Sequence, residues 1–369
     1  MVYFCSVSIY SDTVNITELQ KKFRTQKKAM EHLEWVRWHG EPVCPFCDST
    51  KVYKRKQSFY FHCNDCNRDF TVLKGTIFER SHLPLTKWFQ LIALMLNARK
   101  GLSAKQISRD VGLTYKTAWY SAMRIRCAMI EEPELLEGIV EMDEAYVGGK
   151  PRKRGGSPSS NTAAYSNVSF EKPKRGRGTK KLKVLGVVQR KGKAATRLVA
   201  EIDRKSLLAM LKRNIKLGKD TKVMTDELVL YKAFNKLVNH QSVNHSKKEY
   251  VKGEVHTNTI EGFWSIVKNG IRGQYHVLSK KYLPFYLAEF TYKYNRQHIK
   301  DFAFAETIER GLNKEKCAVN YKPIGRVSSI CYPPKKKKVK EVTAPTPTTR
   351  KRKKSKRKHI TKRKGLYNG

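Results

Sequence analysis

The amino-acid sequence predicts an α/β protein with two smaller modules in front of its main domain. Three observations lead to this prediction: two Cys-x-x-Cys pairs near the start, a short helical segment with a glycine turn, and alternating strand and helix patterns from residue 135. The chain has 369 residues and 40% hydrophobic content. This is enough for two or three folded units with a sizeable core.

Four of the eight cysteines have the spacing of a metal site. Fifteen residues separate two Cys-x-x-Cys pairs in "CPFCDSTKVYKRKQSFYFHCNDC", which contains Cys44, Cys47, Cys63 and Cys66. Each pair can place two thiolates on one tight turn, and two such turns make a tetrahedral four-sulfur zinc site. Because protein thiolates fill all four positions, we expect one structural zinc ion. Two disulfides of a secreted domain are the alternative, which the absence of a secretory signal disfavours.

The zinc ligands predict a zinc ribbon over residues 41–75, preceded by a helical lead over residues 1–40. Between the two cysteine pairs, "KVYKRKQSFYFHC" alternates basic and aromatic residues, as a hairpin with one charged face does. A solvated strand and direct contact with phosphate are both compatible with this pattern.

Residues 83–131 have the pattern of a helix-turn-helix. In "LSAKQISRDVGLTYKTAWYSAMRIRCAM", an apolar core residue, a small residue, a turn glycine and a second packing residue stand at Ile107, Ser108, Gly112 and Ala118. The second helix is expected to begin at Thr114. Its N-terminal end would then expose three candidate DNA contacts: Tyr115, Lys116 and Thr117. A helical hairpin that only mimics the motif is the alternative.

Residues 135–305 predict the main domain. "EGIVEMDEAYVGG", "KVLGVVQRKG" and "TRLVAEID" have strand patterns, "KSLLAMLKRNIKLG" a helix pattern, and "KVMTDELVLYKAF" a buried strand followed by a helix. This succession suits a mixed sheet of ribonuclease H type with flanking helices. Residues 148–181 are rich in Gly, Ser, Pro, Lys and Arg, and we expect a mobile basic insertion there.

Acidic residues stand in two strands that are expected to be buried. Asp143 lies within the first strand and Asp226 at the end of the fourth. Strands rarely bury a carboxylate without a partner, because its desolvation is costly. In the predicted helix of "HTNTIEGFWSIVKNG", Glu261 and Lys268 lie almost superimposed at the edge of an apolar stripe. Three converging carboxylates suit two Mg²⁺ ions about 4 Å apart, which promote displacement at phosphorus.

Four neighbouring residues allow plainer interpretations. Asn258 could cap the helix, with Glu261 three residues later completing a capping box. Glu144 and Glu227 each follow one of the two aspartates, but consecutive strand residues point to opposite faces, so we do not expect either to touch metal. His256 is interpreted as a loop residue, with contact to DNA or to a leaving oxygen as the alternative.

The chain is strongly basic, with 76 Lys and Arg against 32 Asp and Glu and a formal charge of +44. Such a chain repels itself unless a polyanion neutralises it, which points to nucleic acid as the partner. Residues 331–369 carry a large part of this excess without apolar periodicity, so we expect a disordered basic tail. No apolar run approaches the roughly 18 to 20 residues that span a bilayer, so no membrane partner is expected.

Taken in order, the motifs resemble the DDE transposases of the insertion-sequence group called the IS1595 family. This family has an ISXO2-like catalytic domain and is related to eukaryotic Merlin transposases. Five segments carry the resemblance, which runs from about residue 15 to residue 300: the ribbon, "GTIFERSHLPLTKWF", the helix-turn-helix, "EGIVEMDEAYVGGK" with "TDE", and "HTNTIEGFWSIVKNGIRGQYH".

The resemblance implies roles for the acidic residues. Asp143, Asp226 and Glu261 would form a catalytic triad that binds two Mg²⁺ ions, for which Mn²⁺ can substitute. Lys268, seven residues after the third acid, would lie near substrate phosphate. Some family members have Asn in place of the third acid, so Asn258 stays an alternative.

The resemblance also implies a function. The protein would bind the terminal inverted repeats of a DNA transposon, hydrolyse the 3′ ends, and use the freed 3′ hydroxyls to attack target DNA. Its partner would be double-stranded DNA, on which it would assemble as a homo-oligomer. Two alternatives are a non-catalytic DNA-binding protein derived from a transposase and a nuclease that cuts without joining.

The tail departs from the family pattern. In a bacterial host, which we favour, it would be a solvated phosphate-binding segment of a protein acting in the cytoplasm at the nucleoid. In a eukaryotic host, "PPKKKKVK" would serve as a nuclear localisation signal.

Overall fold

The structure is a computed structural model that describes residues 15–56, 58–148, 181–226, 228–243 and 256–313. The expected basic insertion, apart from its two end residues, lies outside the described residues, as do the expected tail and Glu227. Within the described ranges, no helix is both long and apolar enough to cross a membrane.

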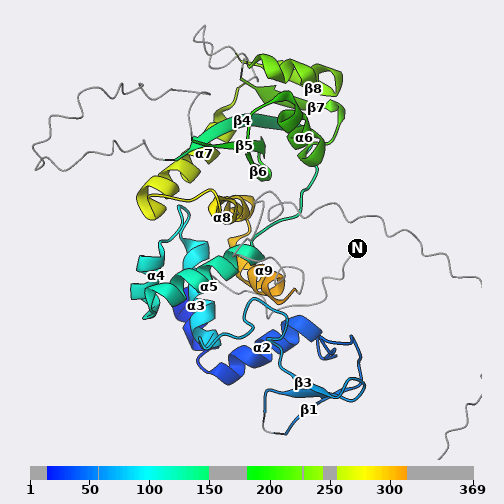
Figure 1. The fold of residues 1–369 in the computed structure, drawn as a ribbon, viewed down its shortest axis with the longest axis vertical. Coiled ribbons are helices and arrows are strands. Elements are labelled where there is room, and N and C mark those ends of the chain that lie inside the picture. Colours follow the sequence, from blue (N-terminus) through cyan, green and yellow to red (C-terminus); the bar gives the residue numbers. More distant parts are fainter. Residues whose placement is uncertain (1–14, 57, 149–180, 227, 244–255, 314–369) are drawn as a thin grey trace, which may run out of the picture. The chain divides into compact units, whose positions relative to one another are not determined.

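Two helices and a small sheet form the N-terminal part of the chain (Figure 1). The helices are α1 (Ile16–Lys22) and α2 (Gln26–Trp38). The sheet is antiparallel throughout and consists of β1 (Val52–Lys54), β2 (Phe61–Cys63) and β3 (Arg68–Phe70). Trp38 packs edge-on against Phe61 and Phe70, so the helices and the ribbon share one core.

The helix-turn-helix follows as α3 (Leu85–Asn97), α4 (Ala104–Val111) and α5 (Tyr115–Ala128). Gly112 ends α4 with φ of 64°, a left-handed conformation that favours glycine. Thr114 caps α5 by accepting the backbone N–H of Thr117. Ile107 and Ala118 are fully buried. The turn and both helices therefore lie where the glycine spacing predicts them.

The main domain is built on a five-stranded mixed sheet in the order β6-β5-β4-β7-β8. Its strands are β4 (Ile139–Val147), β5 (Leu182–Gln189), β6 (Ala194–Val199), β7 (Gly218–Thr225) and β8 (Val238–Ser242). Strand β5 runs antiparallel to β4 and β6, whereas β7 runs parallel to β4 and β8. Three antiparallel strands followed by two parallel ones form a ribonuclease H-like sheet, with β4 at its centre.

Helices cover both faces of this sheet (Figure 1). One face packs on α6 (Arg204–Asn214) and the 3-10 helix η3 (Val229–Lys236). The other face packs on α7 (Asn258–Gly270) and α8 (Leu283–Asn295), with the short π-helix η5 (Ile271–Tyr275) directly after α7. The sequence prediction did not contain strand β8 or the last two helices, α8 and α9 (Lys300–Leu312), and the helix expected after Asp226 is η3.

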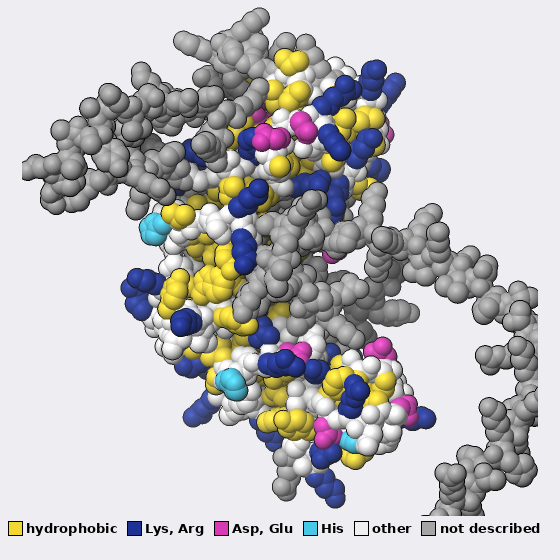
Figure 2. All heavy atoms as spheres, in the orientation of Figure 1, with side chains coloured by type: hydrophobic (Ala, Val, Ile, Leu, Met, Phe, Trp, Pro, Cys, Tyr) yellow, Lys and Arg dark blue, Asp and Glu magenta, His cyan; other side chains and the backbone are white. Residues whose placement is uncertain are grey.

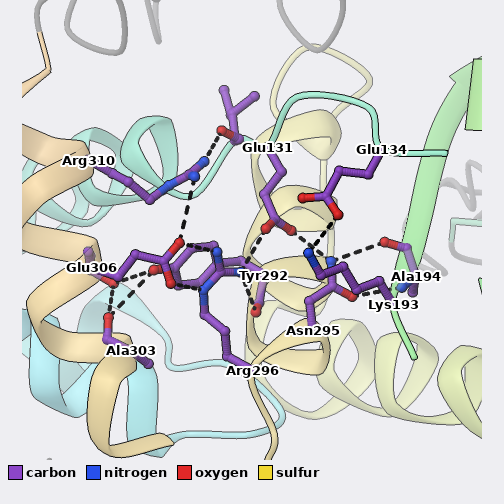
Figure 3. A network of polar contacts seen from close by, with 12 residues as sticks. Glu131, Glu134, Lys193, Ala194, Tyr292, Asn295, Arg296, Ala303, Glu306 and Arg310 are labelled. Carbon is purple, nitrogen blue, oxygen red and sulfur yellow. Dashed lines mark hydrogen bonds and ion pairs between the residues drawn. The ribbon is translucent and has the colours of Figure 1, made fainter. Parts of the chain in front are cut away.

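A partly buried network of charges joins α9 to the segment that leads into the sheet (Figure 3). The Arg296 guanidinium donates to Glu131 at 2.7 Å, pairs with Glu306, and lies 3.6 Å from the centre of the Tyr292 ring. Arg310 donates to the carbonyl oxygen of Ala128 at 2.8 Å. Helix α9 therefore fastens the end of the helix-turn-helix to the main domain.

Candidate active site and zinc site

The two cysteine pairs converge in the ribbon. The Cys44 and Cys66 sulfurs lie 3.6 Å apart, as do those of Cys47 and Cys63, and all four lie within 4.8 Å of one another. Tetrahedral zinc with Zn–S bonds of about 2.3 Å separates its sulfurs by roughly 3.8 Å. These four residues therefore fit a structural zinc ion, which would tie the first cysteine turn to strand β2.

Strands β4 and β7 bring two predicted acidic residues together. The parallel register pairs Glu141 with Met224, so two residues further on Asp143 lies level with Asp226. A carboxylate oxygen from each of these aspartates and one from Glu144 lie within 4.8 Å of one another. Carboxylates grouped in this way are the ligands that Mg²⁺ prefers in proteins.

Asp143, Glu144 and Asp226, which we call the acidic group, lie in an unusual electrostatic environment. Burial is the largest cause that raises the pKa of Asp143, and the negative charges of Glu144 and Asp226 add to it. Together they bring the pKa to about 7, although Lys268 on α7 opposes this effect. Within the part of the chain that the structure describes, Asp143 and Asp226 form no ion pair with Lys or Arg. A cation from outside the chain would relieve their repulsion.

Glu144 lies closer to Asp143 than the alternation of strand residues predicts. It leaves β4 on the face that packs on η3, where the buried Tyr231 hydroxyl donates to its carboxylate at 2.9 Å. Pairing of β4 with β7 ends at Glu141, so the edge of β4 is open beside residues 143 and 144. A carboxylate oxygen of each residue nevertheless lies within 4.8 Å of the other and of an Asp226 oxygen. The expectation that Glu144 points away is therefore wrong.

Glu261 lies on the first turn of α7 and is exposed. Its carboxylate accepts the Thr257 hydroxyl at 3.1 Å and is not part of the acidic group described above. Asn258 is the first residue of the helix, and the preceding Thr257 makes no side-chain capping bond. The alternative interpretation of Asn258 and Glu261 as a capping box is therefore wrong. Lys268 lies seven residues along the same helix.

Helix α7 approaches the sheet closely beside the acidic group. Gly186 on β5 pairs with Asp143, and a Cβ atom added to this glycine would lie 2.4 Å from the Trp264 ring. Only glycine lets the helix come this near. His256, just before α7, is half-buried, and its Nδ1 lies 3.4 Å from the carboxylate of Glu141.

The candidate DNA contacts occupy the first turn of α5. Tyr115 and Lys116 are exposed, with 54% of Tyr115 accessible. Thr117 is half-buried, and its hydroxyl shares a 2.9 Å hydrogen bond with that of Thr114. Two of the three predicted residues are thus available to a partner, while the third completes the cap.

Sequence reasoning missed two buried residues beside the site, Tyr231 and Glu141. Glu141 could have been predicted from the sequence. It precedes Asp143 by two residues on a mostly apolar strand, so both side chains lie on the same face of the sheet. Nothing comparable marked Tyr231, whose partner Glu144 is 87 residues away in the chain.

Comparison with known proteins identifies two segments. Residues 135–295 match the ISXO2-like transposase domain, and residues 24–69 match the transposase zinc-ribbon domain. An uncharacterized protein in the transposable element ISH50 of Halobacterium salinarum is 29% identical over 278 residues, which cover 73% of this chain and 91% of that protein.

Two solved structures of Mos1 complexes are distant matches. The strand transfer complex is 12% identical and covers 64% of this chain and 79% of that chain, with a TM-score of 0.24. The pre-cleavage transpososome is also 12% identical and covers 87% and 100%, again with a TM-score of 0.24. The two domain matches and their order agree with the sequence resemblance, and the chain belongs to the IS1595 family of transposases with an ISXO2-like domain.

Proposed function

We propose that this transposase binds the terminal inverted repeats of its element, cuts the 3′ ends and joins them to target DNA. The observation that carries the proposal is the convergence of Asp143 and Asp226 from neighbouring strands, with Lys268 acting on Asp143 from the facing helix. Their repulsion and the lack of an ion pair with Lys or Arg in the described ranges favour a divalent cation as the missing partner.

Asp143 and Asp226 would hold Mg²⁺ or Mn²⁺, which when bound supplies activation of the attacking oxygen and stabilisation of the leaving oxygen. Glu261 is the third candidate ligand, because its exposed carboxylate can turn away from Thr257 toward the sheet. Lys268 would hold a substrate phosphate beside the acidic group.

DNA is the proposed partner because the chain carries a formal charge of +44. Lys and Arg side chains are spread over much of the visible face, with few Asp or Glu (Figure 2). The exposed N-terminal turn of α5 is the proposed reader of the repeat, and the ribbon would add phosphate contacts. Assembly of a homo-oligomer on two transposon ends is part of the same proposal.

The test is Mg²⁺-dependent cleavage and joining of a labelled duplex that carries the inverted repeat flanking the gene. Wild type should cut and join. Glu261→Gln keeps the size of the side chain but removes its charge, so we expect both activities to fall by about two orders of magnitude or more. Binding of the repeat should stay within a few fold. Glu309→Gln, at an exposed position on α9, is the matched control and should behave as wild type.

Other results would contradict different parts of the proposed function. Full activity of Glu261→Gln would remove Glu261 from the triad and make Asn258 the next candidate. A wild-type protein that binds the repeat without cutting it would favour the non-catalytic alternative, and cutting without joining would favour a nuclease.

A further inference from the structure

Glu141 is a buried carboxylate next to the acidic group that the proposed reaction does not use. It lies on β4 with no exposed surface, two residues before Asp143. Side chains alternate along a strand, so Glu141 and Asp143 point to the same face, together with Ala145 and Val147, which pack on α7. The central strand thus presents two acids toward the helix that carries Glu261.

The Glu141 carboxylate is bonded to the first turn of α7. One oxygen accepts the backbone N–H of Ile260 at 2.9 Å, and the other accepts the Thr259 hydroxyl at 2.9 Å. The first N–H groups of a helix have no partner within the helix, and they carry partial positive charge. Since Thr257 makes no side-chain capping bond, strand β4 supplies the cap that the local sequence lacks.

A cation completes this arrangement. Arg190, just after β5, donates to Glu141 at 2.7 Å and to the carbonyl oxygen of His256 at 3.0 Å. The residues that lead into α7 are therefore tied to the sheet on both sides of the helix start. One turn further on, Trp264 contacts Gly186 on β5, so the first two turns of α7 are located by groups on the two central strands.

We propose that Glu141 is a positioning residue, which fixes the first turn of α7 against β4 so that Glu261 lies within reach of Asp143 and Asp226. A buried ion pair adds little stability compared with well-packed apolar residues. The ion pair of Glu141 instead fixes a geometry. Strand β4 carries the proposed metal ligand Asp143, and through Glu141 it also anchors α7, which carries the proposed ligand Glu261. The geometric part stands on the contacts alone, and the effect on the metal site rests on the proposed function.

The geometric part is tested by hydrogen exchange on protein without DNA or divalent cation. Glu141→Gln keeps the side-chain length but removes the charge that faces Arg190 and the helix start. We expect the amides of residues 258–262 to exchange about tenfold faster or more, with α9 unchanged. Glu137→Gln is the matched control, since Glu137 is exposed and pairs only at the surface with Lys216. It should leave α7 unchanged.

Two results would overturn the geometric part. One is unchanged exchange in α7 of Glu141→Gln. The other is an equal increase in every helix, which would indicate general destabilisation instead of local positioning. Glu141→Asp keeps the charge but shortens the side chain, so it should loosen the same first turn to a lesser degree.

The effect on the metal site is tested by Mn²⁺ titration, with free Mn²⁺ followed by its paramagnetic resonance signal. Glu141→Gln and Glu261→Gln should each weaken Mn²⁺ binding several-fold. The double variant should be little weaker than either single one, because both changes act through one turn of one helix. Fully additive losses, or a loss in only one of the two variants, would overturn the link between Glu141 and Glu261.

Cleavage kinetics separate this inference from the proposed function. If wild type cleaves, Glu141→Gln should lower kcat about tenfold with little change in KM for the duplex, and added Mg²⁺ should restore part of the loss. If wild type binds Mn²⁺ and shows the exchange pattern but does not cleave, the proposed reaction fails while the positioning role of Glu141 stands.

Discussion

Two acidic sites in this protein, the buried Glu289 and the half-buried group around Asp143, differ in how their negative charge is neutralised. Burial raises the pKa of Glu289 on α8, but Lys293 and Arg126, each bonded to it at 2.7 Å, outweigh burial and the pKa is lowered. Among the residues that the structure describes, Asp143 has no such partner, and its pKa is raised to about 7 by burial and by neighbouring carboxylates. The first group is neutralised by the protein itself, whereas the second is left for a cation from outside.

The same distinction applies to the other charged clusters. Glu141 resembles Glu289, since Arg190 neutralises it inside the fold. The four ribbon thiols resemble Asp143, because they converge on a space that suits a metal ion. Unneutralised clusters therefore mark the two candidate metal sites, and neutralised clusters hold elements together.

Zinc removal should have the largest effect. Binding of a structural zinc contributes about 10 kcal/mol or more to the folding of small zinc domains. Protein purified without added metal should contain about one zinc per chain by elemental analysis, and Cys63→Ser should lose the zinc and the protection of β1 to β3 against hydrogen exchange. Cys127→Ser, away from the four thiols, is the control and should keep its zinc. A folded ribbon without zinc would contradict the assignment.

Asp226→Asn should abolish function without weakening the fold. Removing one metal ligand should lower cleavage by about three orders of magnitude, because the cation loses its anchor. In the absence of metal, the same change relieves repulsion with Asp143, so the melting temperature should stay equal or rise. A clear fall in melting temperature would show that Asp226 is neutralised by the protein after all.

Glu289→Gln should have the opposite effect to Asp226→Asn: it should lower the stability of the fold without changing the metal dependence of cleavage. It leaves Arg126 and Lys293 buried without their carboxylate, and breaking a buried ion pair costs about 3 kcal/mol or more. Urea unfolding should detect this loss, while the Mg²⁺ dependence of cleavage by the remaining folded protein should be unchanged. Normal stability together with altered Mg²⁺ dependence in this variant would show that Glu289 belongs with the carboxylates that need an external cation.

The two groups should also respond to pH with opposite signs. The pKa of Asp143 is raised to about 7 from an ordinary value of about 3.9, so its contribution to stability is present below pH 4 and is lost as pH rises through 7. The pKa of Glu289 is lowered, so its contribution is present above pH 5 and is lost as pH falls below its ordinary range near 4.3.

Urea unfolding of metal-free protein between pH 5 and 8 isolates the first effect. Stability from Asp143 should fall across this range, and Asp143→Asn should remove that part of the slope. Excess Mg²⁺ should remove it too, by occupying the site. An unchanged slope in Asp143→Asn would mean that Asp143 titrates at its ordinary pKa.

Features that depend on local spacing could be predicted from the sequence. The four cysteines lie on two short turns, and the zinc ribbon that they predicted is confirmed. Gly112 imposes the turn between α4 and α5, so these two helices lie where the sequence predicted them. Asp143 and Asp226 were predicted to come together because burying a charged carboxylate in an apolar strand costs desolvation free energy unless the carboxylate has a partner. Their neighbouring positions then followed from the parallel pairing of β4 and β7.

Features that depend on contacts between distant segments could not be predicted. The sequence offered Asn258 as a possible cap of α7, but the cap comes from Glu141, 119 residues before Ile260. Helix α9 is held by Arg296, Glu306 and Arg310, whose partners include residues far earlier in the chain. Local patterns contain no information on such partners, so tertiary contacts overrode the local signals.

Lys268→Ala should have the smallest effect, since Lys268 acts on the acidic group without belonging to it. Losing one charge-assisted phosphate contact costs about 1.5 kcal/mol, so we expect cleavage to fall about tenfold and to recover partly with more substrate. Lys268 also lowers the pKa of Asp143, so the variant should need a higher pH for half-maximal rate. Lys268→Arg keeps the charge and should keep both the rate and the pH profile. A loss as severe as that of Asp226→Asn, without recovery at high substrate, would show that Lys268 belongs to the catalytic group itself.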